Sequence, residues 1–177
     1  MFASFPDLSS SASTVQVSKS SVIQNFYALV TSPVTFEDAI KYSAESSYAG
    51  VQGHLFVPSS FVELQQVIET IVIPVTKQNV WLGFSDEAVE GTFVIAAGPN
   101  AGVDASEIIS WGNDEPNGDR QENCVVSSPN YKWAVDATCF SPTFYVIEYE
   151  CPFGKRFNNQ GTACIGTFLV FPSYLWR

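Results

Sequence analysis

Four side chains that carry oxygen atoms lie near one another in the second half of the sequence: Glu115, Asn117, Glu122 and Asp136. Carboxylate and amide oxygens are the ligands that Ca²⁺ prefers, about six to eight of them at ~2.3–2.6 Å. Neither a histidine nor a free thiolate stands among them to favour zinc. If Cys124 and Cys139 formed a disulfide bond, Glu122 and Asp136 would be brought toward each other. This group of residues therefore predicts a calcium site.

Pro116 lies between Glu115 and Asn117, and its peptide bond can orient both neighbours. A cis bond before proline costs only about 0.5–1 kcal/mol. It would turn the two side chains to the same side, where both could reach one ion. A Ca²⁺ ion with open positions can bind two vicinal hydroxyls of a sugar. Each hydroxyl then donates a hydrogen bond to a carboxylate and accepts one from the amide, so we expect a neutral sugar as the ligand.

The same carboxylates could also serve an enzyme, because Glu115 and Glu122 could form the acidic pair of a glycosidase. Carboxylates that bind Ca²⁺ are not free to transfer protons, however, and nothing else in the sequence builds a deep cleft. The sequence also lacks a Gly-x-Ser-x-Gly motif, a Gly-rich phosphate loop and a histidine-based nucleophile arrangement. We therefore expect a binding protein without catalysis.

The chain contains four cysteines, which permit three pairings: Cys124, Cys139, Cys151 and Cys164. Their spacing suits two short disulfide loops, and the absence of a close C-x-x-C pair argues against zinc. Disulfides imply an oxidising compartment, so we expect an extracellular protein or ectodomain. The first residues, MFASFPDLSSSASTVQ, lack the basic and apolar segments of a secretory signal peptide.

The chain is acidic, with a net charge of −10 and only 8 Lys and Arg among 177 residues. Such a surface should repel nucleic acid and anionic membranes. No stretch approaches the ~20 consecutive apolar residues that span a bilayer, so we expect no membrane insertion of this chain. The acidity suits a neutral or cationic partner, although it also serves solubility.

Local patterns predict the elements that position these residues. Apolar residues at helical spacing predict a helix over 36–46 with Thr35 as N-cap, and a second helix over 61–70 capped by Ser59 or Ser60. Its inward positions are Val62, Leu64, Val67 and Ile68. Strands are expected over 22–30, 54–57, 80–84, 93–96, 123–127, 131–135 and 144–149. Ser32–Thr35 should form a turn, and residues 97–122 a long loop of the kind that is usually functional or disordered.

These elements predict an α+β fold in which two helices accompany strands around the long loop. We expect three parts in the chain: a flexible Ser-rich segment over 1–22, the domain over 23–150, and a Cys-containing extension over 151–177. Trp81 should lie in the core, and Trp111 and Trp133 should support the loop rather than stack on a sugar. His54 stands in an apolar strand and is expected to be structural.

From about residue 25 to 150 the chain resembles the C-type lectin domain. The motifs that carry the resemblance follow one another in the family's order: Trp81-Leu82-Gly83, Asp86, Glu90-Gly91, Trp111, Glu115-Pro116-Asn117, Glu122-Asn123-Cys124, Trp133, Asp136, Cys139 and Ile147-Glu148-Tyr149. The resemblance implies a C-type lectin-like fold with antiparallel sheets. In this family, Glu-Pro-Asn implies preference for mannose, fucose or N-acetylglucosamine type sugars over galactose.

The resemblance also implies which residues hold calcium and sugar: Glu115, Asn117, Glu122 and Asp136. Val135 stands where the family has a ligand Asn, which removes one metal ligand and one hydrogen-bond donor to the sugar. An auxiliary calcium site in some members would use Asp86, Glu90 and Asn123, but Gly118 replaces a further acidic ligand there. A calcium-independent module that binds proteins or surfaces on the same fold is the alternative that Val135 favours.

The resemblance further implies how the cysteines pair. The family's short bridge corresponds to Cys124–Cys139, which leaves Cys151 and Cys164 to pair outside the fold. The family's long bridge is absent, because Ser43 and Ile147 stand at its positions. A single site that holds one exposed monosaccharide binds weakly, so a glycan partner would be bound through several domains in a multivalent assembly.

Overall fold

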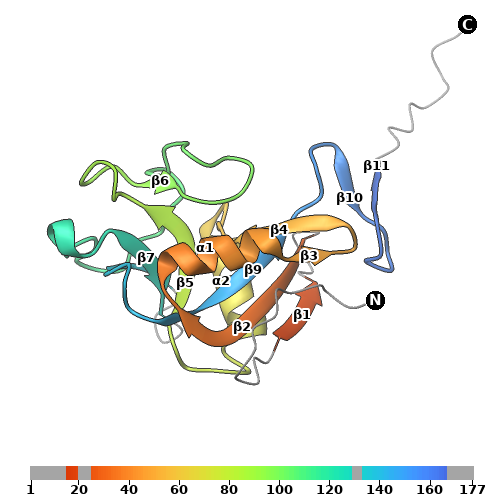
Figure 1. Cartoon of the computed structure of the whole chain (residues 1–177), viewed down its shortest axis with the longest axis horizontal. Coiled ribbons are helices and arrows are strands. Elements are labelled where there is room, and N and C mark those ends of the chain that lie inside the picture. Colours follow the sequence, from red (N-terminus) through yellow and green to blue (C-terminus); the bar gives the residue numbers. More distant parts are fainter. Residues whose placement is uncertain (1–14, 20–24, 129–132, 167–177) are drawn as a thin grey trace, which may run out of the picture.

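The computed structural model describes residues 15–19, 25–128 and 133–166. Within these residues, nine strands form one sheet in which β1-β2-β9-β5-β7-β8 are neighbours, while β3, β4 and β6 branch from this path. The strands of this sheet are β1 Val15–Lys19, β2 Phe26–Val34, β3 Ser47–Tyr48, β4 Val51–Leu55, β5 Val80–Ser85, β6 Val94–Ile95, β7 Cys124–Ser127, β8 Ala134–Ala137 and β9 Thr143–Tyr149. Together with helices α1 (Phe36–Glu45) and α2 (Phe61–Val67), they confirm the α+β prediction (Figure 1).

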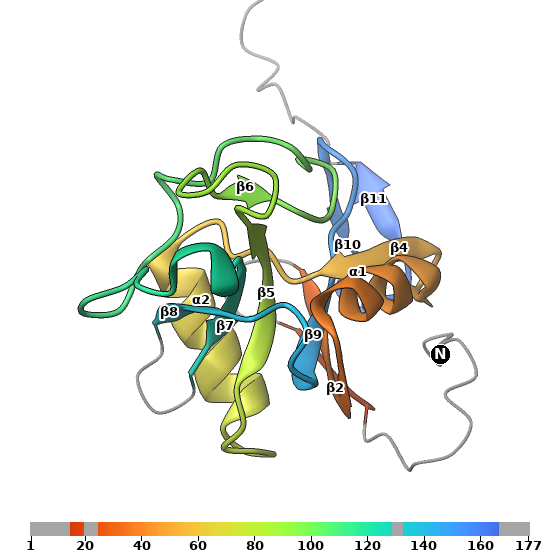
Figure 2. The same ribbon diagram turned by 60° about the vertical axis from the view of Figure 1, so that its left-hand side comes forward.

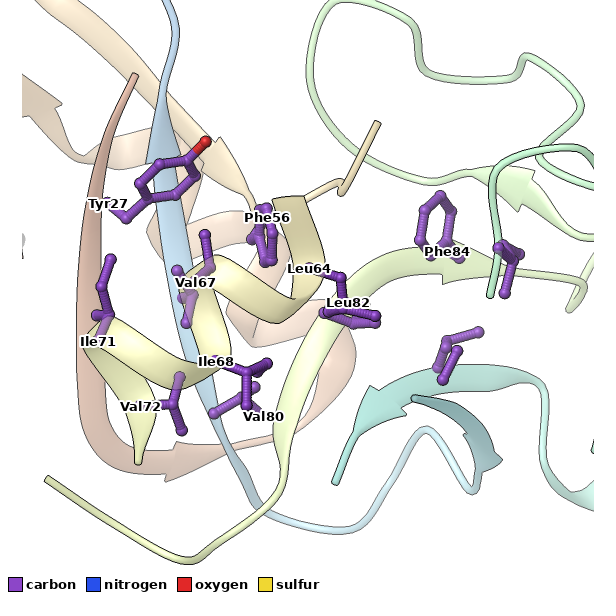
Figure 3. Packing of buried hydrophobic residues seen from close by; sticks show 14 of the residues in the cluster. Tyr27, Phe56, Leu64, Val67, Ile68, Ile71, Val72, Val80, Leu82 and Phe84 are labelled. Carbon is purple, nitrogen blue, oxygen red and sulfur yellow. The ribbon is translucent and has the colours of Figure 1, made fainter. Parts of the chain in front are cut away.

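The sheet is buried on both faces, and alternate residues of its central strands enter two different cores. Tyr27 and Leu29 of β2 belong to the core that α2 covers, which also contains Leu82 of β5. Figure 3 shows Tyr27 and Leu82 in this core beside the side chains of α2. Ala28 and Trp81, one position along each strand, enter the core beneath α1. This burial on both faces explains the apolar runs Phe26–Val30 of β2 and Val80–Phe84 of β5.

Both helices begin where their capping residues predict. Thr35 accepts a hydrogen bond from the backbone N–H of Asp38 at 3.3 Å, and Ser60 accepts one from that of Glu63 at 3.3 Å. The second helix continues past Val67 as one π-helical segment, η1 (Ile68–Val72). The prediction that Val62 points inward is wrong: 59% of it is exposed. It lies two residues before Leu64, which places it about 200° away around the helix from the buried stripe.

Several predicted strand boundaries differ from the structure. The strand expected over 54–57 is β4, which runs from Val51 to Leu55. The turn expected over Ser32–Thr35 is instead the end of β2, which runs to Val34 with an irregular register against β9 after Val30. The strand expected over 131–135 begins at Ala134 and ends at Ala137. Residues 22–24 and 131–132 lie outside the described part of the chain.

Residues Val15–Lys19 form a strand, which corrects the expectation that the whole of 1–22 is flexible. β1 pairs antiparallel with β2, with Val15 opposite Val30 and Lys19 opposite Phe26. The sequence VQVSK alternates apolar and polar residues, as a strand at the edge of a sheet does. The remainder of 1–22 lies outside the described residues.

The C-terminal extension folds back onto the domain. Its cysteines pair as predicted, Cys151 with Cys164, and it contains a two-stranded sheet of β10 (Lys155–Phe157) and β11 (Cys164–Gly166). Phe157 is fully buried, with its ring centroid 4.8 Å from that of Phe26. The extension therefore contributes to the core beneath α1, which corrects the expectation that these cysteines pair outside the fold.

Ser43 and Ile147, at the positions of the family's long bridge, are both buried. Gly53 of β4 lies between them: a Cβ atom there would be 2.8 Å from the Ser43 carbonyl and 2.7 Å from Ile147 Cγ2. Close packing of α1 on β4 and β9 thus holds the helix where the bridge is missing. Within the described residues, no helix has both the length and the apolar character that crossing a membrane requires.

The second half of the long loop and the two ends of the described chain lie on opposite sides of the domain. This half leads to the short 3₁₀ turn η2 (Asp119–Gln121) at the left of Figure 1, whereas β1 and the β10–β11 pair are at the right. The view turned by 60° also keeps the two regions apart (Figure 2). The first half of the loop is different, because its residues 98–100 line a pocket with residues 151–153 of the extension.

Candidate functional site

The loop between β6 and β7 is tied to β8 at its middle. The Gly112 N–H donates to the Ala134 carbonyl at 2.9 Å, and the Ala134 N–H donates to the Ser110 carbonyl at 2.9 Å. Trp111 packs edge-on against Phe93, with ring centroids 4.8 Å apart. Trp111 therefore supports the loop, as predicted, and places Glu115 and Asn117 beside the end of β8.

Asp136 of β8 is the buried anchor of the site. It is only 5% exposed, and its Oδ2 accepts hydrogen bonds from the backbone N–H groups of Asn117 (2.9 Å) and Gly118 (2.7 Å). Its Oδ1 is buried without a hydrogen-bond partner among the described residues. This oxygen is available to a cation.

Glu115 and Asn117 lie side by side at the surface. The Glu115–Pro116 peptide bond is cis, as expected. The Asn117 amide donates through Nδ2 to Glu115 Oε2 at 3.0 Å, and to the Asp114 carbonyl at 3.1 Å. A carboxylate and an amide that touch each other in this way can share one ion or one hydroxyl group.

Negative charge is concentrated around Glu115. Burial raises the pKa of Glu115 to about 7, together with a hydrogen bond to Asp136 and the charges of Asp136, Glu122 and Asp114. The neutral acid donates that hydrogen bond, whereas a bound cation would replace the proton. The electrostatics of the site thus favour binding of a positive charge. Asp114, the immediate neighbour of Glu115, was not among the predicted residues.

Glu122 stands further from this group. Its side chain lies against Gly118, where a Cβ atom would come 2.1 Å from Glu122 Oε2. An acidic residue at 118 would therefore displace Glu122. Among the described residues, Glu115, Glu122 and Asp136 do not bring one oxygen each within 4.8 Å of one another. The Glu122 side chain would therefore have to turn toward Glu115 and Asp136 before the three carboxylates could share one ion.

Val135 cannot supply the missing ligand. Its side chain packs against the core beneath α1. Adjacent residues of a strand point to opposite faces, so Val135 points away from the carboxylate of Asp136. The site therefore offers three carboxylates and one amide, without a second amide.

The auxiliary residues lie on a neighbouring part of the sheet. Asp86 is 3% exposed; its Oδ2 accepts from the Gly91 N–H at 2.7 Å, and its backbone N–H donates to the Asn123 carbonyl at 3.1 Å. Asp86 Oδ1 and Asn123 Oδ1 are both buried without a hydrogen-bond donor from the described residues. Glu90 is exposed.

The other two tryptophans of the described residues, Trp81 and Trp133, have structural roles, as expected. Trp81 is fully buried and donates from Nε1 to the Val34 carbonyl at 2.9 Å. Trp133 is 39% exposed and stacks on Phe61 of α2, with ring centroids 4.2 Å apart. The predicted bridge between Cys124 and Cys139 is present and joins β7 to the segment after β8.

No family model matches the chain. Halomucin from Haloquadratum walsbyi is 28% identical over 136 residues, which covers 71% of this chain and 1% of halomucin. The human C-type lectin domain family 3 member A is 36% identical over 74 residues, which covers 41% of this chain and 34% of that protein. The chain thus spans about a third of the human relative and a hundredth of halomucin.

Solved structures share the fold over about three quarters of this chain. The mouse scavenger receptor C-type lectin carbohydrate-recognition domain superposes with a TM-score of 0.60 at 19% identity, covering 76% of this chain and 93% of that domain. Human lithostathine gives a TM-score of 0.63 at 19% identity, covering 76% and 88%. The chain described here therefore has the fold of the C-type lectin carbohydrate-recognition domain.

Proposed function

We propose that this domain binds mannose-type sugars through a calcium ion held by Glu115, Asn117, Glu122 and Asp136, without catalysis. The observation that carries the proposal is the contact between the Asn117 amide and the Glu115 carboxylate, 3.0 Å apart. Both residues belong to the segment that the Asp136 carboxylate holds through two backbone hydrogen bonds.

Each residue has a distinct role in this proposal. Asp136 fixes the loop with one oxygen and offers the other to the cation. Glu115 and Glu122 supply further carboxylate oxygens, and Glu115 gives up its proton when the cation binds. Asn117 offers its carbonyl oxygen to the ion and its N–H to a sugar oxygen. The bound ion would supply two coordination positions for vicinal hydroxyl groups.

The order Glu115-Pro116-Asn117 supports mannose, fucose or N-acetylglucosamine as the preferred sugar type. The mouse relative of this fold is named a carbohydrate-recognition domain, which supports a glycan partner. The two disulfide bonds of the present chain support an extracellular or ectodomain setting. Weak single sites of this kind gain avidity when several domains bind one glycan surface.

Asp86, Asn123 and Glu90 are proposed as a weaker auxiliary calcium site. Two buried oxygens without donors support it, Asp86 Oδ1 and Asn123 Oδ1. Glu90 is exposed and would have to turn toward them.

The second candidate function is calcium-independent binding of a protein on the same fold. The position of Val135 favours it, because this side chain packs into the core and leaves the site one ligand short. Of the two functions, only the binding of sugar requires the metal ion.

Affinity chromatography on mannose resin tests the proposal. The protein should be retained in millimolar Ca²⁺ and released by a chelator, whereas Glu122→Gln should flow through. The conservative variant keeps the size of the side chain, so its unchanged thermal unfolding serves as the control for folding. Retention that ignores both the chelator and Glu122→Gln would refute the calcium site, and absence of any retention would refute sugar binding and favour the second candidate.

The sugar preference has its own test in the double variant Glu115→Gln with Asn117→Asp. The exchange reverses the positions of carboxylate and amide, and therefore the direction of the hydrogen bonds to the two hydroxyl groups. We expect retention to shift from mannose to galactose resin. Unchanged mannose retention in this variant would place the sugar elsewhere.

A further inference from the structure

A second group of metal-ligating side chains lies away from the Glu115 loop. His54 of β4 is the direct register partner of Glu148 of β9, and Glu150 follows two residues later on the same face. One ligand atom from each lies within 4.8 Å of the others, and no other group of three His, Cys, Asp or Glu in the described residues does so. The three residues line a cavity of about 260 Å³ together with Glu63 and Asn25.

His54 is oriented for a ligand. Its Nδ1 lies 3.0 Å from the Leu55 carbonyl, which places the ring proton on Nδ1 and leaves a lone pair on Nε2. Nε2 is buried without a hydrogen-bond partner among the described residues, and it lies 3.9 Å from Glu150 Oε2. Gly98 covers the ring: a Cβ atom there would be 2.9 Å from Nδ1. The imidazole is therefore held with its free nitrogen facing the carboxylates.

Hydrogen bonds fix the direction of the Glu148 carboxylate. Glu148 is 3% exposed, and its Oε1 accepts a hydrogen bond from Asn25 Nδ2 at 2.8 Å. The backbone N–H of Val57 donates to Oε2 at 3.3 Å. Metal-binding carboxylates and histidines have outer hydrogen bonds of this kind, which fix their direction. Glu63 lines the same cavity as Glu148 and Glu150, so three carboxyl groups surround the space that a cation would occupy.

The number and type of the ligand atoms indicate which metal ion would fit. Ca²⁺ needs about six to eight oxygen ligands, whereas this group offers one imidazole nitrogen and two carboxylates. Zn²⁺ is held by three such ligands at ~2.0–2.2 Å with a fourth position open, which places the ligand atoms roughly 3.4 Å apart. Glu150 is 47% exposed, so its side chain can rotate to close the remaining distance.

We propose that His54 Nε2, Glu148 and Glu150 bind a divalent transition metal ion of the Zn²⁺ class, with its fourth position open to the cavity. This assignment revises the expectation that His54 is only structural. The site is independent of the sugar site, because it shares no residue with it.

The only histidine of the chain makes the test specific. A ¹⁵N-labelled full chain without a histidine tag is titrated with Zn²⁺ alone and followed by the imidazole ¹⁵N resonances. One equivalent of Zn²⁺ should shift the Nε2 resonance strongly and leave Nδ1 protonated. Calorimetry on the variants His54→Gln and Glu150→Gln should show Zn²⁺ affinity reduced by at least about tenfold.

Two results would overturn the proposal: imidazole resonances that do not respond to Zn²⁺, or Zn²⁺ affinity that Glu150→Gln leaves unchanged. The exposed position of Glu150 makes this variant safe for folding, so the second result remains decisive if His54→Gln is unstable. Glu45→Gln is the matched control, because it removes an exposed carboxylate of α1 that belongs to neither proposed site and should leave Zn²⁺ binding unchanged. Failure of mannose binding in the unaltered chain would leave this test unaffected.

Discussion

Replacement of Asp136 separates its two roles, which are to hold the loop and to bind charge. Asp136→Ala removes the acceptor of two backbone hydrogen bonds, from Asn117 and Gly118. Asp136→Asn keeps an oxygen acceptor of the same shape but removes the charge. Both variants should lose calcium-dependent sugar binding, while only the alanine variant should lose most of the loop's support.

The magnitude follows from the number and type of hydrogen bonds. A hydrogen bond to a charged acceptor contributes about 1.5–3 kcal/mol, and the lower value applies where water can replace it, as at this loop. Two such bonds give about 3 kcal/mol for Asp136→Ala and about 1 kcal/mol for Asp136→Asn. In a protein of this size, 1 kcal/mol corresponds to roughly 2–4 °C in melting temperature. We therefore expect a decrease of about 6–12 °C for the alanine variant and about 2–4 °C for the asparagine variant.

Thermal unfolding in the presence of a chelator measures this difference without a contribution from the metal. Carbon NMR of the Glu115 carboxyl group provides a second measure, because Asp136→Asn removes a cause of its raised pKa. That pKa should fall from about 7 toward the ordinary value of 4.5. A melting temperature of Asp136→Ala within about 1 °C of the parent, or an unchanged pKa in Asp136→Asn, would refute this account of the site.

Three further predictions concern pH, the missing amide and the extension. Because the pKa of Glu115 is raised to about 7, the stability that its proton contributes to the metal-free domain is fully present below the ordinary value of 4.5 and is lost as pH rises through 7. Ca²⁺ must displace that proton, so calorimetry should show Ca²⁺ affinity falling as pH falls from about 8 to about 6; a flat profile would contradict this. Val135→Asn should change the Ca²⁺ affinity by no more than about twofold, because the new amide would enter the core beneath α1 and not the calcium site. Burial of this amide should lower the free energy of unfolding by about 1–3 kcal/mol. A large gain in Ca²⁺ affinity would show that the side chain can face the ion. Phe157→Ala should lower the free energy of unfolding by about 3–5 kcal/mol, measured by denaturant unfolding. The control Phe153→Ala removes a fully exposed ring and should change this free energy by less than about 0.5 kcal/mol. Equal effects of the two variants would mean that the extension does not share the core.

Much of the fold is visible in the sequence because its elements carry strong local signals. Thr35 and Ser60 are capping residues directly before apolar positions at helical spacing, and both cap the predicted helices. The strand around Trp81 is apolar throughout because both of its faces are buried. The order of motifs along the chain added the topology, which local patterns do not determine.

The predictions failed where position depends on distant contacts. VQVSK is a weak strand by itself, and β1 exists because the edge of β2 accepts it. Phe157 is near the end of the described chain, yet its place in the core depends on Phe26, far away in sequence. Short segments of this kind become ordered through packing that no local pattern records.

The candidate site also combines features that the sequence reveals with features that depend on distant contacts. The residue types at 115, 117 and 136 identify the chemistry, and the structure brings these three together. The sequence does not reveal that Val135 faces the core, because its orientation depends on the register of β8 against β7. Nor does it pair His54 with Glu148, which only the alignment of β4 with β9 brings opposite each other.

The position of β1 and the β10–β11 pair, across the domain from the Glu115 loop, determines how the domain can be attached. A linker or a coupling tag joined through these strands would leave the loop facing outward, so immobilisation at either end should not block the sugar. Copies tethered in a row through these strands would present their loops away from the tether. The distance between neighbouring sugar sites would then depend on linker length, and so would the avidity for a dense glycan surface.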